Sequence, residues 1–275
     1  MATLITWFWH SETAIEKRMV REYRTGTPLP EDMDSSVDDV IRACAREIRI
    51  LKQLAKSWTL EEAASLLPCF ENRRGVTGAA LFYAMPPPLR IIDLADPLHV
   101  PEALAYAQQL YSAVGYLRVH GLAHLNIRAE TVHVERATRR LVVTDYSMAM
   151  ILDKGLDKKY ATPWLCASPY LPTDTLIFSC ARGLDHVAGN VDPFSIAMLL
   201  YFMLTLALDE PDEWYHASEL VRYRKAKRNT RAWPRSVPPD VSTLVDQCLL
   251  DHREARPRFN VAREHLHALC VQYAV

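Results

Sequence analysis

The feature that most constrains this chain is an apolar run of 15 residues, Phe194–Leu208, without a charged side chain. At 1.5 Å per residue a helix of this length reaches about 22 Å, which is less than the roughly 30 Å hydrocarbon core of a bilayer. A helix that is apolar all round is stable in water only when other elements cover it. We therefore expect a buried central helix in a helix-rich unit, and no membrane span.

The composition provides enough apolar residues to cover such a helix. Hydrophobic residues make up 49% of the 275 residues, which is ample for a core and argues against disorder. The 32 basic and 33 acidic side chains give a net charge of -1, which predicts no general affinity for nucleic acid or anionic lipid. The six cysteines form no Cys-x-x-Cys pair or zinc-finger spacing, so no metal is expected. The scattered cysteines, together with a poor secretory signal at the N-terminus, favour a cytoplasmic or other reducing intracellular compartment.

Residue periodicity predicts strands first and helices later. The start of the chain favours a strand up to Trp9, residues 14–24 fit no single period, and apolar spacing predicts a helix at about 36–55. Pro86–Pro88 looks like a stiff connector. The other predicted strands are Leu66–Phe70, Ala79–Ala84, Thr131–Val134 and Leu141–Thr144; the other predicted helices are Pro101–Gly121, Asp192–Leu208, a region around Glu213–Tyr223, Val241–Leu250 and Val261–Val271. This order indicates an α+β fold, with a small lobe at residues 1–88 and a larger helical lobe at residues 89–275 that together form one domain.

Specific motifs lie between residues 115 and 147. The run HLNIRAET (residues 124–131) is followed by a turn and then by Asp145-Tyr146-Ser147. These residues resemble the catalytic loop and the Asp-Phe-Gly motif of eukaryotic-type protein kinases. The resemblance implies a bilobal kinase fold, with a reduced β-rich N-lobe and a larger α-helical C-lobe.

Matches elsewhere in the chain support the resemblance. Residues 162–169 (TPWLCASP) resemble the end of an activation segment, and Asp192-Pro193-Phe194 resembles the start of the kinase central helix. Arg256 lies in a segment similar to the late arginine-bearing segment of the family. Glu47 lies in a stretch that looks like the regulatory helix, so the matches occur in the family's order along most of the chain.

Several positions of the implied phosphoryl-transfer site are replaced. The first glycine is Gly26, so no Gly-x-Gly-x-x-Gly loop precedes the first predicted helix. Asn126 stands where the family has its catalytic aspartate, and an amide has no carboxylate to take a proton. Thr131 replaces the metal-binding asparagine and is a weaker oxygen ligand. Leu125 replaces the arginine that can receive an activation-loop phosphate.

Other positions keep part of the family pattern. Asp145 matches the metal-binding aspartate, but Ser147 replaces the flexible glycine, and one acidic ligand cannot form a hard-cation site alone. Arg21 is the nearest candidate for the nucleotide-binding lysine, with Lys17 or Arg18 as alternatives, and Glu47 could pair with it or be a surface residue.

Four further positions are interpreted as structural or solvated. By the resemblance, Asp192 hydrogen-bonds the loop backbone near His124, and both are scaffold residues. Arg128 occupies the position of the loop lysine and is expected to be solvated. Arg256 loses its usual glutamate partner, because Pro169 stands where the family has Ala-Pro-Glu.

A basic stretch in the second half of the chain is a candidate interaction surface. Residues 222–235 (RYRKAKRNTRAWPR) contain seven basic side chains and no acidic one. Such a patch can bind an acidic protein surface or RNA phosphates, or it can be a solvated loop. The residues singled out are Arg222, Arg224, Lys225, Lys227, Arg228 and Trp233.

Together the replacements predict a catalytically inactive pseudokinase, not an enzyme, that acts as a protein-binding scaffold or adaptor in a larger assembly. No cofactor is expected, although residual ATP binding stays open. The alternatives are a nucleotide-binding pseudokinase switch, an RNA-binding subunit that uses residues 222–235, and an active but divergent phosphotransferase. Protein partners are favoured over RNA, and no membrane partner is expected.

Overall fold

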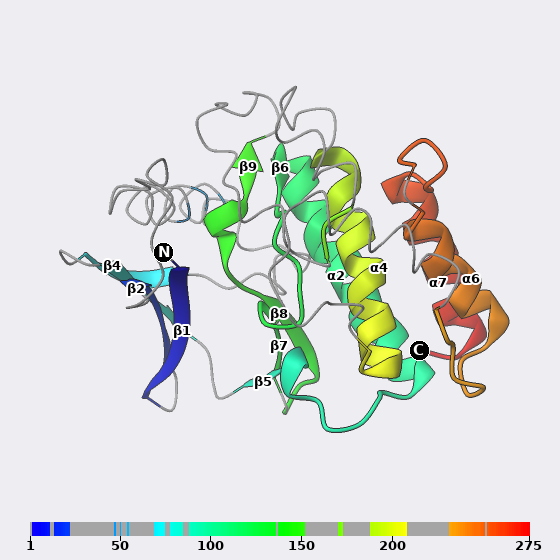
Figure 1. The fold of residues 1–275 in the computed structure, drawn as a ribbon, viewed down its shortest axis with the longest axis horizontal. Helices are drawn as coiled ribbons and strands as arrows, with labels where there is room; N and C mark the ends of the chain where they lie inside the picture. Colours follow the sequence, from blue (N-terminus) through cyan, green and yellow to red (C-terminus); the bar gives the residue numbers. More distant parts are fainter. Residues whose placement is uncertain are drawn as a thin grey trace, which may run out of the picture.

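The computed structural model of the chain describes residues 2–11, 14–22, 47, 50, 54, 69–74, 78–84, 88–135, 137–151, 170–172, 188–207, 231–250 and 252–275. Predictions for residues 162–169, for Glu213–Tyr223, for most of the helix at 36–55, and for Arg222, Arg224, Lys225, Lys227 and Arg228 lie outside these residues. Within them, strands are followed by a set of long helices (Figure 1). This is the α+β, bilobal kinase-like fold that the sequence predicted.

The small lobe contains a four-stranded antiparallel sheet. It is made of β1 (Ala2–Ser11), β2 (Ala14–Glu22), β3 (Cys69–Arg74) and β4 (Gly78–Ala84), in the order β1-β2-β4-β3. The ambiguous residues after Ala14 therefore form a strand that pairs on both sides, with β1 and with β4. The sequence pattern did not predict this strand, because its charged residues interrupt the alternation of apolar and polar side chains. Pairing with a strand on each side stabilises it instead.

The third strand also departs from the prediction. It covers Cys69–Arg74 and so extends four residues past the predicted end at Phe70, while the predicted residues 66–68 lie outside the described part of the chain. A register shift between Cys69 and Glu71 marks a bulge, which lets the strand continue along β4.

Two smaller sheets lie further along the chain. In the first, β5 (Pro88–Arg90) pairs with β7 (Val132–Glu135), which pairs with β8 (Arg140–Val143). Pro88 therefore begins an edge strand, a place where its missing N–H is tolerated. In the second, β6 (Leu122–Ala123) pairs with β9 (Met150–Ile151). The 3₁₀ turns η3 (Ile91–Asp93) and η4 (Tyr146–Met148) follow β5 and β8.

The described helices of the large lobe are α2 (Val100–Val119), α4 (Ala188–Thr205), α6 (Pro239–Cys248) and α7 (Phe259–Gln272). The limits predicted for α2 are confirmed. Pro101 lies in its first turn, and Gly121 follows its end with φ 67°, donating its N–H to the Arg118 carbonyl at 2.9 Å.

Helix α4 is the buried central helix that the apolar run predicted. Every residue from Val191 to Leu204 is buried, and α4 packs against α2, α6 and α7 (Figure 1). Its predicted start at Asp192 is wrong, since the helix begins at Ala188. Pro193 therefore lies inside the helix as its sixth residue, past the first turn, and the helix lacks the backbone bond that an N–H at this position would donate to the carbonyl four residues earlier.

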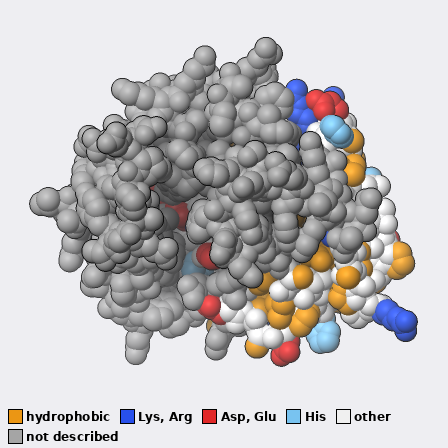
Figure 2. Space-filling model, viewed as in Figure 1, with side chains coloured by type: hydrophobic (Ala, Val, Ile, Leu, Met, Phe, Trp, Pro, Cys, Tyr) orange, Lys and Arg blue, Asp and Glu red, His pale blue; other side chains and the backbone are white. Residues whose placement is uncertain are grey.

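No helix among the described residues is long and apolar enough to cross a membrane. Two of the cysteines, Cys248 and Cys270, are buried free thiols. Figure 2 shows scattered apolar, basic and acidic side chains over the described right-hand part of this face, as expected for a chain with almost no net charge.

Candidate active site

The loop of residues 124–131 joins β6 to β7 and is held by a buried carboxylate. Asp192 of α4 accepts hydrogen bonds from the backbone N–H of His124 (3.0 Å) and of Leu125 (2.8 Å). Burial raises the pKa of Asp192, and the two backbone bonds partly oppose this rise. Leu125 has φ 61°, a conformation that a leucine rarely adopts, so the two bonds from Asp192 hold the loop in a strained shape.

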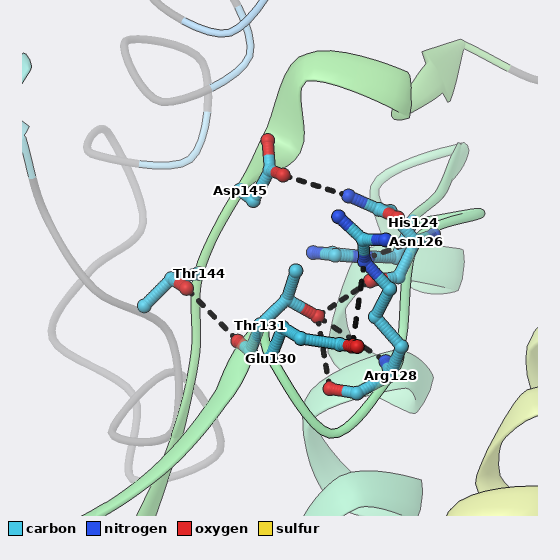
Figure 3. Close-up of polar contacts among 7 residues, drawn as sticks. All are labelled: His124, Asn126, Arg128, Glu130, Thr131, Thr144 and Asp145. Carbon is cyan, nitrogen blue, oxygen red and sulfur yellow. Dashed lines mark hydrogen bonds and ion pairs between the residues drawn. The ribbon is translucent and has the colours of Figure 1, made fainter. Parts of the chain in front are cut away.

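Thr131 closes the other end of the loop. Its hydroxyl donates to the Asn126 carbonyl at 2.6 Å and accepts from the Arg128 N–H at 3.2 Å. Its carbonyl accepts from both the N–H and the hydroxyl of Thr144, each at 2.9 Å. The Thr131 hydroxyl therefore joins the loop to itself, and it is not directed outward as a cation ligand (Figure 3).

Asn126 and Asp145 point toward one another across the site (Figure 3). The Asn126 side-chain Nδ2 donates to Asp145 Oδ2 at 2.8 Å, and the Asn126 backbone N–H donates to His124 Nδ1 at 3.2 Å. The second bond requires that His124 Nδ1 carry no proton. Asp145 is fully buried and has φ 65°, a left-handed conformation that aspartate tolerates better than most residues.

The residue after Asp145 connects the site to the small lobe. Tyr146 donates its N–H to Glu47 Oε1 at 3.2 Å, and its ring packs edge-on against His124 at 4.9 Å. Glu47, Ile50 and Leu54 are helical and buried, and their spacing places them on one helix face. The interpretation of Glu47 as a surface residue is therefore wrong. Its predicted pairing with Arg21 stays open, because the side chains of Arg21 and Ser147 lie outside what the structure describes.

Arg128 supplies positive charge beside this pair. Its side chain is 32% exposed and its Nε lies 3.7 Å from Glu130 Oε2, a distance at which an ion pair contributes little to stability. The guanidinium extends toward Asn126 in Figure 3. Arg128 is thus part of the site's lining and only partly solvated.

Arg256, interpreted from the sequence as structural, and Trp233, expected on an interaction surface, both contact the helical core. Arg256 is buried with its guanidinium 5.6 Å from the ring centre of Phe194. Trp233 donates its indole N–H to Asp246 at 3.2 Å and packs edge-on against Tyr201 of α4. The Trp233 ring therefore serves packing in this structure, which leaves less of it for stacking on a partner.

Two residues of the site were missed by sequence reasoning. Thr144 ties the end of β8 to Thr131, and the Tyr146 ring contacts His124. Tyr146 had a signal, since it is the middle residue of the motif that begins at Asp145. Thr144 had none, because its role depends on a carbonyl 13 residues away.

The oxygen donors of the site fit one hard cation that arrives with a ligand. Asp145 offers a carboxylate and Asn126 an amide oxygen, while the Thr131 hydroxyl is taken. Magnesium is commonly bound through one or two carboxylates together with substrate phosphates. Among the described residues no group of three or more His, Cys, Asp or Glu could hold a metal ion by itself.

Comparison with known proteins identifies the family. The profile of the family "Protein tyrosine and serine/threonine kinase" matches residues 17–266 of the chain. The chain is similar to maternal embryonic leucine zipper kinase of Xenopus tropicalis, with 25% identity over 171 residues, which is 62% of this chain and 24% of that protein.

Two further relatives point the same way. CBL-interacting protein kinase 25 of Oryza sativa subsp. japonica is 30% identical over 148 residues, which is 54% of this chain and 27% of that protein. Serine/threonine-protein kinase SBK2 of Rattus norvegicus is 29% identical over 140 residues, 43% of this chain and 39% of that protein. The match spans about a quarter of the length of the frog and rice proteins.

These relatives overturn two predictions made from the sequence. An inactive scaffold that is not an enzyme was expected from the replaced residues, whereas the relatives are all named as kinases and point to kinase function. The prediction counted residue identities at single positions. It gave too little weight to the site as a whole, in which the loop, Asp145 and Glu47 are joined by hydrogen bonds. The chain belongs to the protein tyrosine and serine/threonine kinase family.

Proposed function

We propose that the chain transfers the terminal phosphoryl group of a nucleoside triphosphate, ATP in the first instance, to a hydroxyl group of a protein. The observation that carries the proposal is the buried Asp145 carboxylate, held at 2.8 Å by Asn126 at the end of a loop fixed by Asp192. The kinase names of the relatives support it.

The amide at position 126 is compatible with this reaction. Phosphoryl transfer depends mainly on positioning and on stabilising charge. The hydroxyl oxygen of the acceptor forms a bond to the terminal phosphorus while the bond to the bridging oxygen breaks. The nucleoside diphosphate leaves, and the hydroxyl proton passes to solvent or to the transferred group. Asn126 Oδ1 accepts a hydrogen bond from the hydroxyl and so orients it, although it cannot remove the proton.

The other side chains of the site have complementary tasks. Asp145 would hold a divalent cation bound to the triphosphate, and that cation would neutralise the charge on the phosphates. Arg128, whose guanidinium extends toward Asn126, places a second positive charge beside the transferred group. Glu47 keeps the backbone after Asp145 in place. Since a general base contributes roughly 10²–10⁴-fold to a rate, we expect slow turnover.

The remaining assignments follow from the same chemistry. A protein is the proposed partner, as phosphoryl acceptor, because two of the relatives are named as protein kinases. A cytoplasmic or other reducing compartment is proposed, which suits the buried free thiols of Cys248 and Cys270.

Transfer of label from γ-labelled ATP to a mixture of generic protein substrates tests the proposal. Asp145→Ala removes the carboxylate, and label transfer should fall to background. Arg253→Ala is the control, because it removes an ion pair with Glu254 that lies outside the loop and the Asn126–Asp145 pair, and its transfer should equal that of the unaltered chain. Equal transfer by the Asp145→Ala variant, or no transfer by the unaltered chain, would refute the function.

A further inference from the structure

An exposed threonine lies in the turn between β7 and β8, next to basic residues. Thr138 is exposed, and so are its neighbours Ala137 and Arg139. In the sequence, Arg136, Arg139 and Arg140 lie within two residues of this threonine. The turn therefore presents a hydroxyl group to solvent beside several positive charges.

The Thr138 hydroxyl is part of the hydrogen bonding of the turn. It donates to Glu135 Oε2 at 2.6 Å and accepts from the Arg140 N–H at 3.2 Å. The Arg139 N–H donates to the Glu135 carbonyl at 2.8 Å, which closes the turn. A threonine oxygen that accepts a backbone N–H two residues later is a common way to hold a turn. The Thr138 oxygen therefore has a backbone donor directed at it.

The Arg139 guanidinium is held only weakly. Its side chain is 73% exposed, and its Nη1 lies 3.7 Å from Glu102 Oε1 on α2. An exposed ion pair of this kind contributes little to stability, so the guanidinium can exchange partners at small cost. The Arg139 backbone is fixed more firmly, since its carbonyl accepts from the Gln109 side chain of α2 at 3.3 Å. A stronger anion at position 138 would therefore attract the guanidinium without displacing the hairpin.

Glu135 is the anion that now lies beside the Thr138 hydroxyl. The Glu135 oxygen that accepts from Thr138 also lies 3.3 Å from Arg140 Nε, and Arg140 makes a further interaction. A phosphate ester on threonine carries a charge of about −1.5 to −2 at pH 7 and has three strong acceptor oxygens. Such a group would break the bond to Glu135 and repel its carboxylate. Charge-assisted hydrogen bonds from nearby donors would offset that loss.

We propose that Thr138 is a phosphorylation site of an arginine-directed protein kinase, and that the Arg139 guanidinium and the Arg140 N–H hold the resulting phosphate. The Thr138 oxygen forms a bond to the terminal phosphorus of ATP while the bond to the bridging oxygen breaks. ADP leaves, and the hydroxyl proton passes to the general base of the modifying kinase. The arginines around Thr138 complement the acidic side chains with which such a kinase selects its substrates. This modification is separate from the proposed function, because here the chain accepts the phosphoryl group.

Incubation of the full chain with ATP and an arginine-directed protein kinase tests the assignment. Mass spectrometry of the digested chain then locates the phosphate, and we expect it on Thr138. Ser112 is the matched control hydroxyl: it is exposed on α2, but no lysine or arginine lies within two residues of it, so it should stay unmodified. Thr138→Ser should keep the modification at position 138, since serine supplies the same hydroxyl group.

The phosphorus resonance of the modified chain reports the surroundings of the phosphate. The second pKa of a phosphate ester is about 6. In the folded chain this pKa should lie below that value, because a nearby guanidinium favours the doubly charged form. Arg139→Ala should return the phosphate pKa to its usual value. Arg235→Ala removes an exposed arginine outside the hairpin and should leave the pKa lowered.

A full chain whose Thr138 stays unmodified after incubation with the kinase would overturn the site. A phosphate pKa that is not lowered in the folded chain, or that Arg139→Ala and Arg235→Ala change alike, would overturn the role of Arg139. A parallel reaction without the added kinase reports the chain's own transfer activity. Failure of the proposed function would therefore appear separately from failure of this assignment.

Discussion

Two aspartates of the large lobe accept several hydrogen bonds each, yet their surroundings drive their pKa values in opposite directions. Asp192 is buried on α4, and burial raises its pKa although two backbone N–H groups donate to it. Asp240 lies partly exposed in the first turn of α6. Its slight loss of hydration is outweighed by hydrogen bonds from Tyr273, Val241 and Gln272, which lower its pKa.

The two carboxylates have different tasks. Asp192 holds a loop of the site in place, whereas Asp240 joins the start of α6 to the end of α7. At Asp192 burial raises the pKa, while two buried N–H groups in the strained loop at Leu125 depend on its oxygens as acceptors. At Asp240 the same kind of bonds form in contact with water, where each contributes less. Hydrogen-bond counts alone would have ranked Asp240, with three donors, above Asp192, with two.

The largest expected effect comes from neutralising each aspartate in turn. Asp192→Asn leaves at least one buried loop N–H without its acceptor, so we expect unfolding free energy to fall by roughly 2–4 kcal/mol. Asp240→Asn should lower it by less than about 1 kcal/mol, since water can replace the lost bonds. Urea denaturation of both variants measures the two losses of unfolding free energy. Equal losses would show that burial does not make the bonds to Asp192 more stabilising than those to Asp240.

A smaller effect is expected from removing one hydroxyl group at each site. Thr131→Val deprives the Asn126 carbonyl of its donor and the Arg128 N–H of its acceptor, with an expected loss of about 1–3 kcal/mol and slower phosphoryl transfer. Tyr273→Phe removes the phenol that donates to Asp240 and should cost less than about 1 kcal/mol. Denaturation and the label-transfer assay together check both. A Thr131→Val variant with unchanged stability would show that the loop is held without this hydroxyl.

The smallest effect is a pH dependence of opposite sign at the two aspartates. Because the folded pKa of Asp192 is raised, its contribution favours folding at low pH and is lost as pH rises above the usual value of 3.8. Because the folded pKa of Asp240 is lowered, its contribution is present above 3.8 and is lost as pH falls below it.

The measurement is the unfolding free energy from pH 3 to 7 for the unaltered chain, Asp192→Asn and Asp240→Asn. The difference from Asp192→Asn should shrink as pH rises, and the difference from Asp240→Asn should grow. Slopes of the same sign for both variants would show that burial does not dominate at Asp192.

Much of the fold could be predicted because it depends on local patterns. The uncharged run at Phe194–Leu208 fixed the position of α4, and Gly121 marked the end of α2. The strand β2 and the true start of α4 at Ala188 could not be predicted, because partner strands and neighbouring helices select them. The site followed the same division: motif spacing brought His124 and Asp145 into one site, but not the bond between Asn126 and Asp145.

The sequence by itself determined the main helices and most of the strands, although not β2, and it determined which residue types occupy the kinase motifs. Periodicity and motif spacing are properties of neighbouring residues. Only the tertiary structure decided that the Thr131 hydroxyl faces the loop, that Trp233 packs on Tyr201, and that Glu47 meets the Tyr146 backbone. Donors and acceptors far apart in the chain meet only after the core has packed. The charge and hydrogen bonding of the site are therefore tertiary properties.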